Sequence, residues 1–207
     1  MSYPVIVGVE PTYANRNRLT TFFRLLLAIP HIILVGGAGF AFGYNTDNRS
    51  ASGEGGLLGA VAVFMAIVSW FTLVSAGTHI TGIRQFTAFY LRWRVRAVSY
   101  LMLFEDPYPP FGDAPYPASI EILEPLAARD RLSIALRLIY VIPHAVVLVF
   151  LMIAWCFTTI AAWFVILFTG AYPKALYDFG VGAMRWRLRV EAYMLLMVDD
   201  YPPFSLD

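Results

Sequence analysis

The feature that most constrains the fold of this chain is an internal duplication of its apolar segments. RLTTFFRLLLAIPH (18–31) recurs as RLSIALRLIYVIPH (131–144), and LRWRVRAVSYLMLFEDPYPPF (91–111) recurs as MRWRLRVEAYMLLMVDDYPPF (184–204). The copies are 113 residues apart at the first block (18 to 131) but only 93 apart at the second (91 to 184). Copy one therefore contains about 20 extra residues, in a stretch rich in Gly, Ser and Asn at 36–56 that is typical of a polar loop.

The bulk composition indicates which solvent these copies fold in. Hydrophobic residues make up 59% of the 207 residues, charged residues 14%, and the mean hydropathy is +0.64. Soluble domains carry roughly 25% charged residues, so this composition predicts a membrane protein. The net charge of +1 gives no extended basic surface for nucleic acid.

The apolar runs are read as two helical hairpins. A hydrocarbon layer of ~30 Å needs about 20 helical residues, and copy one has two runs of that length. The single run of copy two, 132–170, is too long for one crossing, so the duplication predicts a tight turn near Val149–Ala154. The predicted transmembrane helices are 19–43, 57–80, 132–149 and 153–170.

A segment of mixed character follows each predicted hairpin, at 84–104 and 174–198. At helical spacing its basic residues form one stripe opposite an aromatic and aliphatic face, which is typical of an amphipathic helix lying in the headgroup layer. A strand is the alternative, because Arg185, Arg187 and Arg189 also alternate with period 2.

Short elements open and close each copy. The runs Val5–Val9 and Ser119–Leu123 are β-like, and YPPF turns end both copies because proline fixes φ. We predict an all-α membrane protein with four transmembrane helices in two tandem hairpin repeats, 1–112 and 113–207, each followed by an amphipathic interfacial helix. Tandem copies with one orientation predict a symmetry axis along the membrane normal.

The positions of the basic residues predict the orientation. Only Arg49 of the fifteen Lys and Arg lies in the copy-one loop, and the others flank or follow the predicted hairpins. Cytoplasmic segments carry the excess of basic residues. We therefore predict a multi-pass protein with both termini and 84–131 in the cytoplasm, and Asn45–Gly56 outside.

Each copy places an arginine seven residues before a proline-preceded histidine. Arg24 and His31, like Arg137 and His144, are two helical turns apart and share one helix face. The imidazoles could satisfy the backbone that the prolines disrupt. Two other interpretations stay open, namely contact with lipid or substrate, and a proton relay or a haem held between His31 and His144.

The motifs RWRVR (92–96) and RWRLR (185–189) suggest either positive-inside anchoring or recognition of anionic headgroups or an acidic partner. Trp93 and Trp186 are predicted interface anchors. The aspartates before the YPPF turns are predicted to cap a helix or to pair with arginines rather than to act as acid–base catalysts. The candidate lipid- or partner-binding residues are Arg18, Arg24, His31, Arg92, Arg96, Arg131, Arg137, His144, Arg185 and Arg189.

The repeated blocks YPVIVGVEP, RLLLAIPH and LRWRVRAVSYLMLFEDPYPPF, with their second copies, resemble a bacterial membrane-protein family catalogued as domain of unknown function 4389. The resemblance covers essentially the whole chain. Because the family is known from actinobacteria, it implies location in the plasma membrane. It implies no activity and no catalytic residues.

Three function classes follow. The sequence has no phosphate-binding glycine loop, metal-ligand spacing or nucleophile elbow, so we predict no enzymatic activity and no cofactor. The leading hypothesis is an accessory or scaffold subunit that contacts lipids and a protein partner or a second copy. A lipid or small-molecule carrier or channel using the cleft between the repeats is the alternative, and a bis-histidine haem or proton-relay protein is the third.

Overall fold

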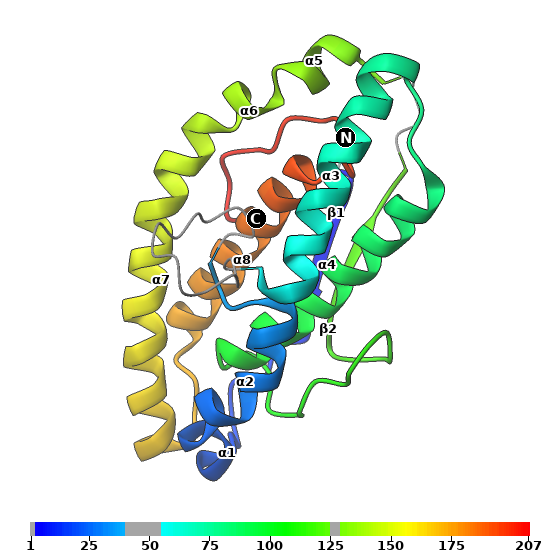
Figure 1. Ribbon diagram of the computed structural model, residues 1–207. Helices are drawn as coiled ribbons and strands as arrows, with labels where there is room; N and C mark the ends of the chain where they lie inside the picture. Colours follow the sequence, from blue (N-terminus) through cyan, green and yellow to red (C-terminus); the bar gives the residue numbers. More distant parts are fainter. Residues whose placement is uncertain (1–2, 40–54, 125–128) are drawn as a thin grey trace, which may run out of the picture.

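The structure is a computed structural model that describes residues 3–39, 55–124 and 129–207. It is mostly helical, with one small sheet (Figure 1). In chain order the elements are β1 (Val5–Val9), α1 (Arg18–Phe22), α2 (Arg24–Val35), α3 (Gly56–Ala76), α4 (Thr81–Leu101), β2 (Ala118–Ile122), α5 (Arg131–Ala135), α6 (Arg137–Tyr140), α7 (Ile142–Thr169) and α8 (Lys174–Met194).

The apolar residues of copy two form one long helical path. α5, α6 and α7 follow one another, separated only by breaks at Leu136 and Val141. Pro143 lies in the first turn of α7, where its missing N–H costs no helical hydrogen bond. The predicted turn at Val149–Ala154 is wrong, because α7 is continuous through it.

Copy one forms the same path with an interruption. A Cβ on Gly56, the first residue of α3, would lie 2.7 Å from the Leu34 carbonyl near the end of α2. The chain therefore leaves the path at Gly36 and returns to the same place, so that α2 and α3 together correspond to α6 and α7. The extra residues of copy one interrupt a helix and do not connect two crossings.

The two paths run in opposite directions. α1 lies beside the end of α7, where Arg16 N–H donates to the Gly170 carbonyl at 2.9 Å. At the other end α5 lies beside the end of α3, and Arg131 Nη1 donates to the Ser75 carbonyl at 3.2 Å. Figure 1 shows α1 and α5 at opposite ends of the molecule. From the sequence, both copies are predicted to have the same orientation. The structure shows antiparallel copies, because a repeat in sequence does not specify the direction of each copy in space.

The sheet has the same antiparallel arrangement. β1 and β2 pair so that Val7 lies opposite Ile120, and both side chains are buried. The two predicted β-like segments are confirmed as strands. They contact α8 and α4, respectively.

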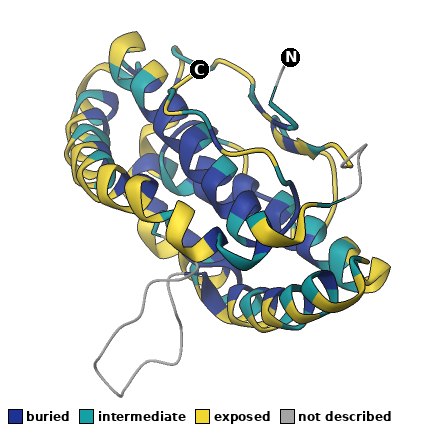
Figure 2. Cartoon of the chain, turned by 90° about the horizontal axis from the view of Figure 1, so that it is seen from above, coloured by how far each residue is buried: buried dark blue, intermediate teal, exposed yellow. Residues whose placement is uncertain are grey.

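The helices α4 and α8 form the centre of the protein. Most residues in the second half of each are buried, as the dark core in Figure 2 shows. The helical interpretation of these segments is confirmed. They are not surface helices, because α2, α3 and α7 pack on them from one side and the sheet packs on the other, and their predicted place in the headgroup layer stays a prediction.

The outer helices carry the apolar surface. α3 and the stretch Arg137–Thr169 are long and apolar enough to cross a membrane, where the sequence predicted four such helices. α2 is apolar but has only 12 residues. The predicted external loop Asn45–Gly56 lies almost wholly outside the described residues.

Candidate functional site: duplicated clamps and a cavity between the copies

The arginine seven residues before the histidine of each copy is held in a buried clamp. Arg24, 1% exposed, donates through Nη2 to Asp106 Oδ1 at 2.8 Å and through Nη1 to the Glu105 carbonyl at 2.5 Å. Its guanidinium also lies 4.1 Å from the ring centre of Tyr100. Arg16 joins the same carboxylate, with Nη2 3.1 Å from Asp106 Oδ1.

Copy two repeats the arginine, aspartate and tyrosine contacts of this clamp. Arg137 donates to the Tyr193 carbonyl at 2.7 Å and to Asp199 Oδ1 at 3.0 Å, with its guanidinium 4.2 Å from the Tyr193 ring centre. Arg129 Nη2 lies 2.6 Å from Asp199 Oδ1. The predicted pairing of these aspartates with arginines is confirmed.

The histidines occupy a second repeated clamp. Trp93 Nε1–H donates to His31 Nδ1 at 3.1 Å, and Trp186 Nε1–H donates to His144 Nδ1 at 3.0 Å. The phenylalanine of each YPPF turn stacks on the imidazole, with ring centres 4.6 Å apart for Phe111 and 3.9 Å apart for Phe204. Because Nδ1 accepts a hydrogen bond, a neutral imidazole here carries its proton on Nε2.

These contacts decide between the earlier interpretations. The tryptophans are 7% exposed and bind histidine, so their predicted role as interface anchors is wrong. The imidazoles bind tryptophan and the backbone of the YPPF turns, at Pro109 and Pro202, and in the described part of the chain no hydrogen bond is found to the carbonyls of Leu26 and Ile139 that the prolines free. All ring contacts described for His31 are with copy one and all those for His144 with copy two, so the structure does not bring the two histidines together for a shared haem.

A third charged cluster joins the two copies. Arg94 and Arg187 hold equivalent positions in the RWR motifs, and both bind the carboxylate of Glu191, at 2.9 and 3.2 Å. All three side chains are fully buried. Tyr90 donates to Glu191 Oε1 at 3.1 Å, and both arginines donate to the Gly39 carbonyl.

The other predicted arginines divide into two groups. Arg92 and Arg96 both bind Asp113 at 2.8 Å, and Arg185 donates to the Val7 carbonyl at 3.2 Å, so these side chains bind the chain itself. Arg189 lies near the ring of Tyr3. The exposed members of the predicted set are Arg18 and Arg131, one at each end of the molecule.

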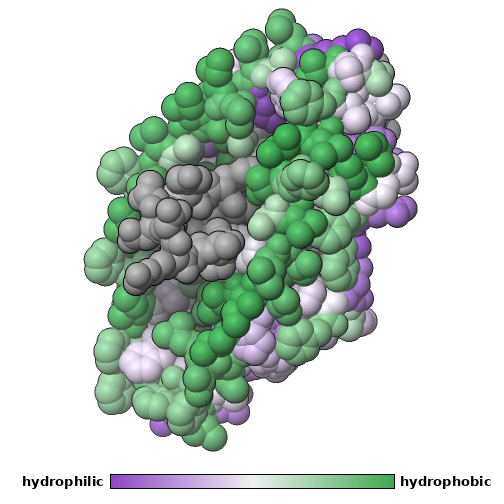
Figure 3. Space-filling view, in the orientation of Figure 1, coloured by the Kyte–Doolittle hydropathy of each residue, from purple (hydrophilic) through white to green (hydrophobic). Residues whose placement is uncertain are grey.

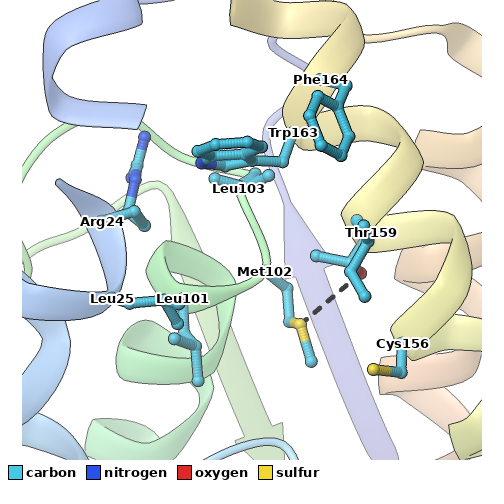
Figure 4. Close-up of a pocket in the computed structure, with 10 residues that line it drawn as sticks. Arg24, Leu25, Leu101, Met102, Leu103, Cys156, Thr159, Trp163 and Phe164 are labelled. Carbon is cyan, nitrogen blue, oxygen red and sulfur yellow. Dashed lines mark hydrogen bonds between the residues drawn. The ribbon is translucent and has the colours of Figure 1, made fainter. Parts of the chain in front are cut away.

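A cavity of about 510 Å³ lies between the copies (Figure 4). Leu25 and Leu101 of copy one line one side, and residues of α7 line the other. Thr159 donates its hydroxyl hydrogen to the Met102 sulfur across the gap, at 3.6 Å. The volume falls within the range of small-molecule sites, ~300–1,000 Å³. The α7 residues in the wall are Cys156, Thr159, Ile160, Trp163 and Phe164.

Glu105 lies beside the Arg24 clamp and is 2% exposed. Burial raises the pKa of its carboxyl to about 7, although nearby Arg16 and Arg24 act in the opposite direction. Copy two has Val198 at this position, so the titrating group belongs to copy one alone.

Sequence reasoning missed Glu191, Glu105 and Asp113 as partners. Glu191 and Glu105 stand opposite Val98 and Val198 in the other copy, so neither is part of the repeated pattern. An acidic residue unique to one copy of an apolar repeat was the available signal. Within the described ranges, no group of three or more His, Cys, Asp or Glu is placed to hold a metal ion.

The fold and its clamps define a tandem-repeat, mostly helical protein with two helices that could cross a membrane. The family described as Domain of unknown function (DUF4389) matches residues 55–112 and 131–205, more than half of the chain and one segment in each copy. The protein belongs to this family. No curated protein and no solved structure matches the chain.

Removing the carboxylate charge of Asp199 should destabilise the protein. Burial acts to raise the Asp199 pKa, but Arg129 and Arg137 outweigh it and hold the pKa below its usual value of 3.8. This contribution is therefore present at neutral pH and is lost only as the pH falls through the lowered pKa. Asp199→Asn should lower the free energy of unfolding by about 2 kcal/mol at pH 7, measured by denaturation in detergent micelles. Asp200→Asn, the same change at the exposed neighbour, is the matched control, and equal losses in both variants would contradict the clamp.

Glu105 should make stability depend on pH near neutrality. Because the folded pKa, about 7, lies above the usual carboxyl value of 4.5, the folded state binds more protons between these values, and stability falls as the pH rises through this window. Glu105→Gln should raise the free energy of unfolding by about 1–3 kcal/mol at pH 8 and leave it nearly unchanged at pH 4. Thermal melts from pH 4 to pH 8 test this, and a parallel pH profile in wild type and variant would refute it.

Proposed function

We propose that the protein is a non-enzymatic integral membrane protein of the bacterial plasma membrane, with both chain ends on the cytoplasmic side. The observation that carries this proposal is the apolar outer surface of α2, α3 and α7, which covers much of the face in Figure 3. Phe150 and Phe157 are each 69% exposed, and Phe168 is 79% exposed. Contiguous apolar surfaces of this kind mark sites that meet a membrane or another protein.

Within the membrane, we propose that it serves as an accessory or scaffold subunit of a larger complex. The buried arginines support this role, because carboxylates of the same chain bind them. Arg24 and Arg137 are held within their own copies, and Arg94 binds Glu191 of the other copy, so that the two copies keep one arrangement. The exposed Arg18 and Arg131 are available for anionic lipid headgroups or for acidic groups of a partner.

A second candidate function is binding of a lipid or an apolar small molecule between the copies. The cavity at Arg24 favours it, because a carrier that uses the cleft between repeats needs a space there. The guanidinium of Arg24 is engaged by Asp106 and Tyr100, so the ligand would be recognised mainly by its apolar part. His31 and His144 belong to the aromatic clamps and are not among the residues that line the cavity.

The scaffold proposal predicts a stoichiometric protein partner. Mild extraction of the tagged protein from its native membranes, followed by mass spectrometry of proteins and lipids, should recover that partner at a constant ratio. The double variant Arg18→Gln, Arg131→Gln should lose part of the bound lipid or partner. The single variants Arg18→Gln and Arg131→Gln should each lose less, and Lys174→Gln is their control, since it also removes one positive charge at an exposed position. A stable monomer recovered alone would contradict the scaffold role.

The cavity candidate predicts that filling the space displaces a bound lipid. Thr159→Trp would place an indole in the cavity, whereas Ile153→Trp adds the same group on α7 at a position 51% exposed and outside the cavity wall. Lipid retained per protein after mild purification should fall several-fold in Thr159→Trp and stay at the wild-type level in Ile153→Trp. Equal retention in the two variants would exclude the cavity as the lipid site.

A further inference from the structure

The outer helices carry most of the exposed large apolar side chains, whereas the sheet side carries exposed charged ones. α2, α3 and α7 pack on one side of α4 and α8, and the sheet packs on the other. On α7, the exposed Val146, Phe150 and Phe157 form part of one outward stripe at helical spacing. On the sheet side, Arg92 and Asp113 form an ion pair whose side chains are 38% and 40% exposed, and Glu121 is exposed on β2.

The charged groups on the sheet side lie at the middle of the molecule's length. Arg92 and Arg185 stand near the middle of the 21-residue helices α4 and α8. These helices run back along the outer helices, since Trp93 contacts His31 of α2 and Tyr90 contacts Gly59 of α3. Arg185 donates to Val7, the central residue of β1.

A spanning orientation would place this polar face in hydrocarbon. If α3 and α7 ran along the membrane normal, the Arg92–Asp113 pair and Glu121 would lie near the bilayer centre. A charged side chain there costs several kcal/mol, and open sheet edges do not occur in lipid-exposed positions. The 28 residues of α7 also extend about 42 Å, well beyond the ~30 Å core.

We infer that the protein lies along the membrane, with the outer faces of α2, α3 and α7 embedded in one phospholipid leaflet and the sheet side facing water. This inference rests on the proposed membrane location and replaces the multi-pass topology predicted from the sequence. The in-plane orientation accounts for the antiparallel copies. A twofold axis perpendicular to the membrane relates them, so both ends of the molecule lie at the same membrane surface.

The diameter of the outer helices and the positions of two exposed arginines both fit a phospholipid leaflet as the partner of the apolar face. A helix about 10 Å in diameter fits within one leaflet of a ~30 Å core, and interfacial helices bury ~5–10 Å. Each end of the molecule presents an exposed arginine, Arg18 beside Gly170 and Arg131 beside Gly77. Two such cations at the ends of the apolar face are placed to meet anionic headgroups.

Cysteine labelling from the two sides of the membrane tests this orientation. The single cysteine, Cys156, is first replaced by serine, and one cysteine is then introduced at a time. Lys174→Cys marks the α1 end, Thr78→Cys the α5 end, and Glu121→Cys the sheet, and all three positions are exposed. Asp178→Cys and Thr81→Cys, at exposed positions, provide a second pair of ends in case a first variant does not fold. A membrane-impermeant maleimide is applied to intact spheroplasts and to inside-out vesicles.

We expect all of these cysteines to label from the inside-out vesicles and at least tenfold less from spheroplasts. Cys156 of the wild-type protein should label only after detergent is added. Labelling of the two ends from opposite sides would overturn the in-plane orientation and leave the membrane location standing. A Glu121→Cys variant protected in vesicles but reactive in detergent would equally overturn it, because the sheet side would then be covered. Recovery of the protein in the soluble fraction after carbonate washing would instead overturn the proposed membrane function.

Discussion

A single buried carboxylate, that of Glu191, connects the two copies of this protein. It binds Arg94 of copy one and Arg187 of copy two, which hold equivalent positions, and both arginines also bind the carbonyl of Gly39 just beyond α2. Removing one partner of a buried ion pair typically costs ~3–5 kcal/mol, because a desolvated charge is left behind. The positions of α4, α8 and the end of α2 therefore depend on one another through this group.

The duplicated clamps likewise pair a buried arginine with a carboxylate, once in each copy. Each copy carries arginines within an apolar body, and the aspartate before the YPPF turn compensates them. The turn then places its phenylalanine on the histidine that tryptophan already holds. Proline-rich segments that look like simple chain ends in the sequence thus cover the polar groups of the outer helices, which leaves those helices free to present apolar side chains outward.

The sequence predicted the repeat, the strands and the aspartate–arginine pairs, because each of these is a local pattern that occurs twice. It did not predict the direction of the copies or the continuity of α7, since both depend on contacts between the copies. The extra segment of copy one looked like the loop of a hairpin, but a break in a helix has the same signature. The arginine stripe of α4 and α8 was assigned to the headgroup layer, because the duplication drew attention to residues that recur, and the partners Glu191 and Asp113 each occur in one copy only.

Positions at which the two copies carry different residues distinguish contacts that the fold requires from groups that only one copy has. The Arg–Asp and Trp–His contacts recur in both copies and therefore serve the architecture. Glu105, opposite Val198, and the cavity wall residue Thr159, opposite Ala66, occur in one copy only. Both lie close to Arg24, since Glu105 binds it through its carbonyl and the cavity includes it. A function that needs only one site per chain is therefore expected at the Arg24 end. There the two copies have the same backbone arrangement but carry chemically different side chains.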